Sequence, residues 1–161
     1  MTDSNDDDRA AVGDAAEAAH RFCNGCNCSQ SVLSVYAQRY GLDPSVAMRI
    51  ATGLGGGVGR MGGSCGTLTG AALVLGLEYG PVEAGDQAAK DRTYQATGQL
   101  QRRFIEKHGS NQCKDLLQRD LSIESEYQDA RAQGLFKTHC PHFVETAVTL
   151  LDELIRENRK T

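Results

Sequence analysis

The chain has 161 residues, of which 24% are charged, 40% are hydrophobic and 6% are aromatic, and its net charge is −4. This length favours one domain with its own core, and so mild a charge excludes a surface built to attract nucleic acid. No apolar run approaches the ~20 residues of a membrane-spanning helix. The first eight residues, MTDSNDDD, have neither the basic nor the apolar region of a secretory signal. The sequence therefore predicts a cytoplasmic protein.

Residues 1–12 are acidic and polar and lack periodicity, so we expect a disordered segment there, followed by a single all-helical domain over residues 13–161. In the first half of that domain, the apolar spacing and the capping signals predict four helices. They cover residues 14–22, 26–40 and 44–54 and, after a glycine-rich loop, 65–79.

The second half of the chain continues the helical pattern. A long polar helix is expected over residues 86–108, and Ser110 is expected to cap a short helix that carries Cys113. A further helix is predicted over residues 124–133, and the last begins at Cys140-Pro141 with apolar residues at near-ideal helical spacing. Because strand signals are absent, the predicted fold is an all-α compact bundle of six to eight helices.

The helix over residues 65–79 is small and apolar nearly all round, which predicts a central, buried position. Gly66, Gly70 and Gly76 lie inside it, and each costs roughly 1 kcal/mol relative to alanine. We therefore expect close helix contacts at these glycines. The same small, apolar surface would also suit a homodimer interface.

Half of residues 53–70 are glycine, which indicates backbone that passes very close to a neighbour or adopts positive φ. The stretch from Gly57 to Gly62 matches G-x-G-x-x-G, but no strand precedes it, so a dinucleotide site is not expected. We expect Gly56, Gly57, Gly59 and Gly66 to bring backbone amides close to a bound cofactor. Arg60 is expected to neutralise an anionic site, to bind an anion or, as is more common for such an arginine, to anchor the loop.

Six cysteines occur in the chain: Cys23, Cys26, Cys28, Cys65, Cys113 and Cys140. In a reducing compartment, scattered cysteines indicate metal binding or redox chemistry more than structural disulfides. The alternative for any single cysteine is a small buried apolar side chain.

Cys28, Cys65, Cys113 and Cys140 share one context, because each falls at or in the first turn of a predicted helix. Unpaired N–H groups and the positive end of the dipole lie there, and both are expected to lower a thiol pKa. Such a set of thiolates suits an iron–sulfur cluster, a structural zinc ion or a dithiol–disulfide couple. Structural zinc favours closely spaced ligand pairs, which these four are not, but spacing does not separate a cluster from a disulfide pair.

Cys23 and Cys26 form a Cys-x-x-Cys, which Cys28 extends. A c-type haem would need His at position 27, and Asn27 stands there, so no haem is expected. No βαβ pattern supports a thioredoxin-like site. The two cysteines are either extra ligands, a resolving thiol, or incidental residues beside a site.

Five short segments together resemble the C_GCAxxG_C_C family, redox-active proteins with four characteristic cysteines. The segments are Phe22-x-x-Gly25-x-Asn27-Cys28-Ser29-Gln30-Ser31-Val32, Gly55-Gly56-Gly57-Val58-Gly59-Arg60, Cys65-Gly66-Thr67-Leu68-Thr69-Gly70-Ala71, Cys113-Lys114-Asp115-Leu116-Leu117 and Cys140-Pro141-His142-Phe143-Val144. The resemblance covers about residues 15–155. Thr67 departs from it, because the family usually has alanine there.

The resemblance implies a small helical protein related to the cluster-bearing part of split-Soret cytochromes. It implies that Cys28, Cys65, Cys113 and Cys140 hold an iron–sulfur cluster of the [2Fe–2S] type, and Cys23 and Cys26 leave room for a larger or second cluster. The leading hypothesis is electron transfer or redox sensing with a redox partner protein, rather than a stand-alone enzyme. The alternatives are a metal-free thiol–disulfide protein and a module for zinc or Cu(I).

Overall fold

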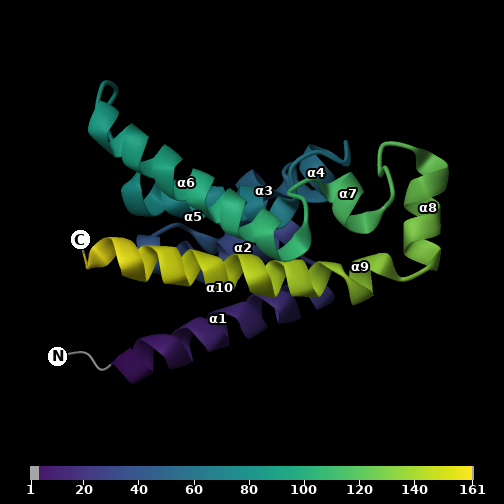
Figure 1. Ribbon diagram of the computed structural model, residues 1–161, viewed down its shortest axis with the longest axis horizontal. Helices are drawn as coiled ribbons and strands as arrows, with labels where there is room; N and C mark the ends of the chain where they lie inside the picture. The colour runs from purple at the N-terminus through teal and green to yellow at the C-terminus, as the bar shows by residue number, and fades with distance from the viewer. Residues whose placement is uncertain (1–3, 161) are drawn as a thin grey trace.

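The computed structural model describes residues 4–160, and of residues 4–12 it describes the backbone alone. Regular structure in this range is helical, apart from one isolated β-bridge between Ser64 and Gln112 (Figure 1). The all-α prediction is therefore confirmed. None of the helices in residues 4–160 combines the length and apolarity that crossing a bilayer requires.

The first half of the described chain contains α1 (Ser4–Cys23), α2 (Cys28–Tyr36), the 3₁₀ helix η1 (Ala37–Tyr40), α3 (Pro44–Thr52), α4 (Gly55–Val58) and α5 (Gly66–Tyr79). The second half contains α6 (Gln87–His108), α7 (Cys113–Leu117), α8 (Glu124–Ala132), α9 (Leu135–Thr138) and α10 (Cys140–Arg159). The sequence did not predict α4 and α9, which are single turns of four residues.

Most predicted boundaries lie within two or three residues of the observed ones. Helix α1 begins at Ser4, earlier than the predicted residue 14. Residues 1–3 and 161 lie outside the described part of the chain, so the division into residues 1–12 and 13–161 stays a prediction. The start of α7 also differs: its N-cap is Gln112, and Ser110, two residues earlier, accepts a hydrogen bond from the Gln112 N–H instead of capping the helix.

Helix α10 lies along the middle of the molecule, between α1 on one side and α6 on the other (Figure 1). Its apolar stripe is buried over its whole length, as the i, i+3, i+4 pattern predicts, and includes Val144, Val148, Leu151 and Leu154. Helices α7, α8 and α9 gather at the end of the bundle where α10 begins, away from the end of the chain. The packed core therefore fixes the position of Cys140 at that end.

Helix α5 packs closely against α2, and glycines make this possible. A Cβ at Gly70 would lie 2.7 Å from the Ser29 carbonyl oxygen, and a Cβ at Gly66 would lie 2.8 Å from the Cβ of Cys28. The central, buried position predicted for α5 is confirmed. The close helix contact that was expected at Gly76 is absent, because a Cβ added there would meet nothing within 4 Å.

A left-handed turn lies between α3 and α5. Residues 56–60 all have φ between 62° and 72°, and Val58 and Arg60 among them are not glycine. Left-handed backbone costs a non-glycine residue roughly 1–2 kcal/mol, so the surrounding structure must hold this turn in place. It does so through backbone hydrogen bonds, including Gly59 N–H to the Gly53 carbonyl (2.8 Å) and Gly63 N–H to the Gly57 carbonyl (2.9 Å).

One polar pair lies inside the core between α2 and α10. The Tyr36 hydroxyl donates to Oδ1 of Asp152 at 2.7 Å, and Oδ2 of Asp152 is buried without a hydrogen-bond partner. Burial raises the pKa of Asp152 to about 6, although the Tyr36 hydrogen bond opposes this shift. The folded protein therefore holds a proton on Asp152 more tightly than the unfolded chain does.

The left-handed turn yields a paired prediction. Gly57→Ala should reduce the free energy of unfolding by about 3 kcal/mol or more, because its Cβ would lie 2.5 Å from the Gly63 amide nitrogen. Gly59→Ala should cost only about 1 kcal/mol, since that Cβ enters open space and only φ is strained. Urea unfolding of both variants tests this, and equal losses would contradict the packing described here.

Asp152 yields a pH prediction. Because its pKa is raised in the folded state, its contribution to stability is most favourable below about pH 4 and is lost as pH rises toward 6. Relative to the Asp152→Asn variant, the free energy of unfolding of the wild-type protein should fall by about 2 kcal/mol across this interval, given 1.36 kcal/mol per pKa unit and some solvent screening. Urea unfolding of both proteins at several pH values measures this difference in stability. The difference should be independent of pH if folding does not raise the pKa of Asp152.

Candidate functional site

Four cysteines lie at the starts of four different helices. Cys28 is the first residue of α2, Cys113 of α7 and Cys140 of α10, while Cys65 is the N-cap of α5. The predicted helix-start positions of all four are therefore confirmed. Cys65, Cys113 and Cys140 are buried, and Cys28 is partly buried.

The four thiols come together at one end of the bundle. The Cys28 thiol is hydrogen-bonded to the Cys140 sulfur, which joins α2 to α10. Cys28 is close enough to Cys65 to raise the pKa of that thiol, and both act in the same way on Cys113. Residues spread over more than 110 positions of sequence thus form one cluster, which we call the thiol cluster.

A short backbone bridge fixes Cys65 beside Cys113. The Cys65 N–H donates to the Asn111 carbonyl at 2.8 Å, and the Cys113 N–H donates to the Gly63 carbonyl at 2.7 Å. This pairing flanks the isolated bridge between Ser64 and Gln112. The glycine-rich loop therefore positions two of the four cysteines, a role that the sequence analysis did not foresee because the bridge has no local sequence signal.

A capping box positions Cys28. The Asn27 side chain accepts from the Gln30 N–H, and the Gln30 side chain accepts from the Asn27 N–H, both at 2.9 Å. The same two side chains donate to Thr52 at the end of α3. Asn27 and Gln30 were named above for the family resemblance and not as a cap, although their N-x-x-Q spacing is a recognisable N-terminal signal.

Burial controls the thiol pKa values. Desolvation by burial raises the pKa of Cys65 and that of Cys113 to about 12, and neighbouring thiols add to both shifts. The hydrogen bond to Cys140, followed by burial, raises the pKa of Cys28 well above its ordinary value. The expectation that helix starts lower the pKa is wrong for these three thiols. Desolvation outweighs the N–H groups and the dipole at Cys65 and Cys113, and at Cys28 the hydrogen bond to Cys140 together with desolvation does so.

Several N–H and O–H groups nevertheless point at these sulfurs. The Gly56 backbone N–H donates to Cys28, and the N–H groups of Thr67 and Leu68 donate to Cys65. The Thr67 side chain is fully buried, and its hydroxyl lies 3.2 Å from the Cys65 sulfur. Thr67, noted above only as a departure from the family pattern, is thus a direct neighbour of the site.

A pocket of about 540 Å³ opens beside the thiol cluster. Cys28, Cys113 and Cys140 line it, while Cys65 is buried behind them. Its other lining residues are mainly apolar or glycine, and they include two aromatic side chains, Tyr127 and Phe136, that the sequence analysis did not single out.

The remaining predicted site residues are placed as follows. Gly56, Gly59 and Arg60 line the pocket, whereas Gly57 packs on the backbone of Gly62 and Gly63. Gly66 lies against the Cβ of Cys28. Their predicted role in cofactor binding stays a prediction.

The extra cysteines differ from each other. Cys26 is partly buried and lines the pocket, whereas Cys23, at the end of α1, is exposed and does not. The structure therefore brings Cys26, but not Cys23, to the edge of the thiol cluster.

The residues around the thiol cluster meet several needs of a metal centre. Four thiols, hydrogen-bond donors aimed at two of them and an adjoining pocket match what an iron–sulfur cluster takes from a protein. Among residues 13–160, whose side chains the structure describes, however, no group of three or more His, Cys, Asp or Glu residues is already arranged to hold a metal ion. The chemistry of the residues fits the group, and the side chains would have to turn toward it.

Comparison with known proteins gives a match to a protein family. No curated protein and no solved structure matches the chain. A family model described as "Putative redox-active protein (C_GCAxxG_C_C)" matches residues 26–154, which include all four cysteines at helix starts. The chain therefore belongs to the C_GCAxxG_C_C family of redox-active proteins.

Proposed function

We propose that this chain is a redox protein that holds an iron–sulfur cluster through Cys28, Cys65, Cys113 and Cys140. The observation that carries the proposal is the gathering of four thiols from four separate helix starts, of which Cys28, Cys113 and Cys140 line one pocket and Cys65 is buried next to Cys28 and Cys113. Thiolates are the ordinary ligands of such clusters, and a bound cluster would supply one-electron chemistry. The work of the chain itself is to hold the sulfurs and to keep water away.

Burial supports a metal-bound state over a reactive free thiol. Cys65 and Cys113 have raised pKa values, so they are poor nucleophiles near neutral pH. A cation bound at the same place would favour their thiolates, because metal ions deprotonate coordinating thiols. The N–H groups of Gly56, Thr67 and Leu68 would then stabilise the negative charge on sulfur.

The proposal extends to the type of cluster, the partner protein, the oligomeric state and the compartment. We favour a [2Fe–2S] cluster, which four thiolates satisfy, with a larger cluster as the alternative if Cys26 takes part. A redox partner protein would exchange electrons with it, and a homodimer remains a further proposal. A reducing compartment such as the cytoplasm would keep the thiols available.

The contact between Cys28 and Cys140 favours a second candidate, a metal-free thiol–disulfide couple. Oxidation would join the two sulfurs and release two protons and two electrons to an oxidant such as a partner disulfide. This candidate predicts two fewer free thiols in the oxidised protein, without bound iron.

Single Cys→Ser variants of the four proposed ligands test the leading candidate. Protein purified without oxygen should be coloured and contain iron and sulfide, and each of Cys28→Ser, Cys65→Ser, Cys113→Ser and Cys140→Ser should lose most of both. Cys23→Ser is the matched control and should retain them, because Cys23 is exposed and outside the pocket lining. Iron and sulfide assays, together with the visible spectrum before and after dithionite, provide the readouts.

Three results would count against the cluster or against its proposed ligands. Unchanged iron in the four variants would reject the ligand assignment. A colourless protein with two thiols that cycle between oxidation states would support the disulfide couple. A colourless protein with stoichiometric zinc or copper would support a metal-binding module.

Thr67 is expected to tune the redox centre. Thr67→Ala removes the hydroxyl that lies 3.2 Å from the Cys65 sulfur, and Thr67→Ser keeps a hydroxyl. Hydrogen bonds to sulfur stabilise the more negative reduced state, so Thr67→Ala should lower the reduction potential by on the order of 40 mV, if the bond is worth about 1 kcal/mol. Potentiometric titration measures this shift, and an equal potential in all three proteins would show that the hydroxyl is not a donor to Cys65.

A further inference from the structure

The pocket beside the thiol cluster has an unusual charge distribution. Among its lining residues, Arg60 is the one charged side chain, and no aspartate or glutamate is present in the lining. Leu117, Leu121 and Phe136 supply apolar wall. A volume of about 540 Å³ lies within the range of small-molecule sites, so the pocket has room for an organic ligand next to the thiols.

Arg60 has no carboxylate partner in the described part of the chain. Arg103, Arg119 and Arg159, by contrast, each pair with an aspartate or glutamate. The Arg60 guanidinium instead lies 4.5 Å from the centroid of the Tyr127 ring. A cation stacked on an aromatic ring keeps the N–H donors at its edge available for an anion, and arginine binds carboxylates with two such donors.

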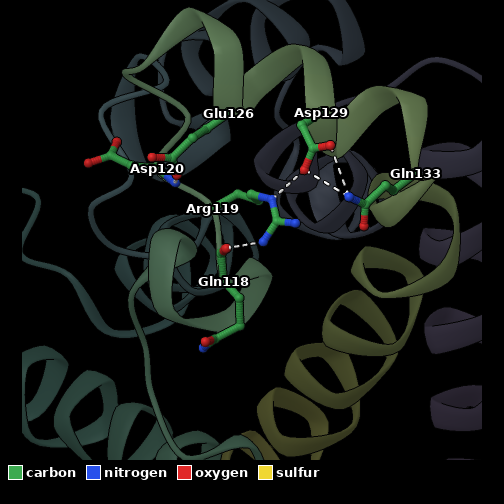
Figure 2. A network of polar contacts seen from close by, with 6 residues as sticks. All are labelled: Gln118, Arg119, Asp120, Glu126, Asp129 and Gln133. Carbon is green, nitrogen blue, oxygen red and sulfur yellow. Dashed lines mark hydrogen bonds and ion pairs between the residues drawn. The ribbon is translucent and has the colours of Figure 1, made fainter.

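Tyr127 is held at the pocket by a polar network around α8. Arg119 donates to Asp129 at 2.6 Å, Gln133 donates to the same carboxylate, and the Asp120 N–H donates to Glu126 at 2.5 Å (Figure 2). The Arg119 and Asp120 contacts join α8 to the segment that follows α7, while the Gln133 contact lies within the end of α8. The Tyr127 ring, on which Arg60 stacks, therefore belongs to a part of the pocket wall that these hydrogen bonds hold in place.

We propose that the pocket binds a small organic anion that has a carboxylate and a flat apolar body. The carboxylate would pair with Arg60, and the body would lie along the wall formed by Leu117, Leu121, Tyr127 and Phe136. This binding site goes beyond the proposed redox function and does not depend on a bound metal.

Two probes of similar shape but different charge test the site: 1-naphthoate and the neutral 1-naphthylmethanol. Calorimetric titration of the wild-type protein should give saturable 1:1 binding of 1-naphthoate. The alcohol should bind at least about tenfold more weakly. Arg60→Gln should reduce the affinity for 1-naphthoate by about tenfold and leave the affinity for the alcohol unchanged. Arg131→Gln is the matched control, because Arg131 lies 5.9 Å from the same ring but does not line the pocket.

Equal affinity of the two probes for the wild-type protein would overturn the proposal, and that comparison needs no variant. Absence of saturable 1-naphthoate binding, or equal losses in Arg60→Gln and Arg131→Gln, would also overturn it. Arg60→Lys keeps the charge and should bind 1-naphthoate more tightly than Arg60→Gln if charge recognition is correct. Iron is assayed in the same samples, so a protein without iron would count against the redox proposal and leave the anion result standing.

Discussion

The contact between α2 and α5 is the constraint on which the rest of the site depends. At Gly66 and Gly70 the two helices approach so closely that no side chain fits between them, and this places Cys28 directly over the start of α5. A methyl group at Gly66 would have to displace the Cβ of Cys28. Helix packing at this point therefore sets the position of the Cys28 thiol as well as the stability of the core.

The remaining cysteines are attached to that contact by different means. The glycine-rich loop hydrogen-bonds to the segment before α7 and fixes Cys113 beside Cys65. Cys140 is held by the long buried stripe of α10 behind it. A left-handed turn that includes Val58 and Arg60 is maintained between these elements, and strained backbone of this kind is typical of functional sites.

Two opposing electrostatic effects act on the thiols. Helix starts and aimed N–H groups favour thiolates, whereas burial favours neutral thiols and dominates the pKa values of Cys65 and Cys113. The N–H groups are thus arranged for a negative charge that neutral thiols do not carry. A cation would reconcile the two effects, since it favours thiolate in a dry environment, and this is the physical basis for preferring a metal-bound state. In the lining of the same pocket, Arg60 offers a positive charge without a carboxylate partner in the described residues.

The sequence by itself determined the all-α fold, most helix boundaries and the location of four cysteines at helix starts, because periodicity and capping are local properties. It also indicated close packing at Gly66 and Gly70, since glycine inside a buried helix needs a reason. Tertiary structure alone decided which cysteines meet, and it showed that Gly76 has no such contact and that Cys26 and Cys23 differ. The pocket walls at Tyr127 and Phe136, the bridge between Ser64 and Gln112 and the raised thiol pKa values were likewise beyond local reasoning. They depend on distances between residues far apart in the chain and on the exclusion of water by the assembled core, which no local pattern encodes.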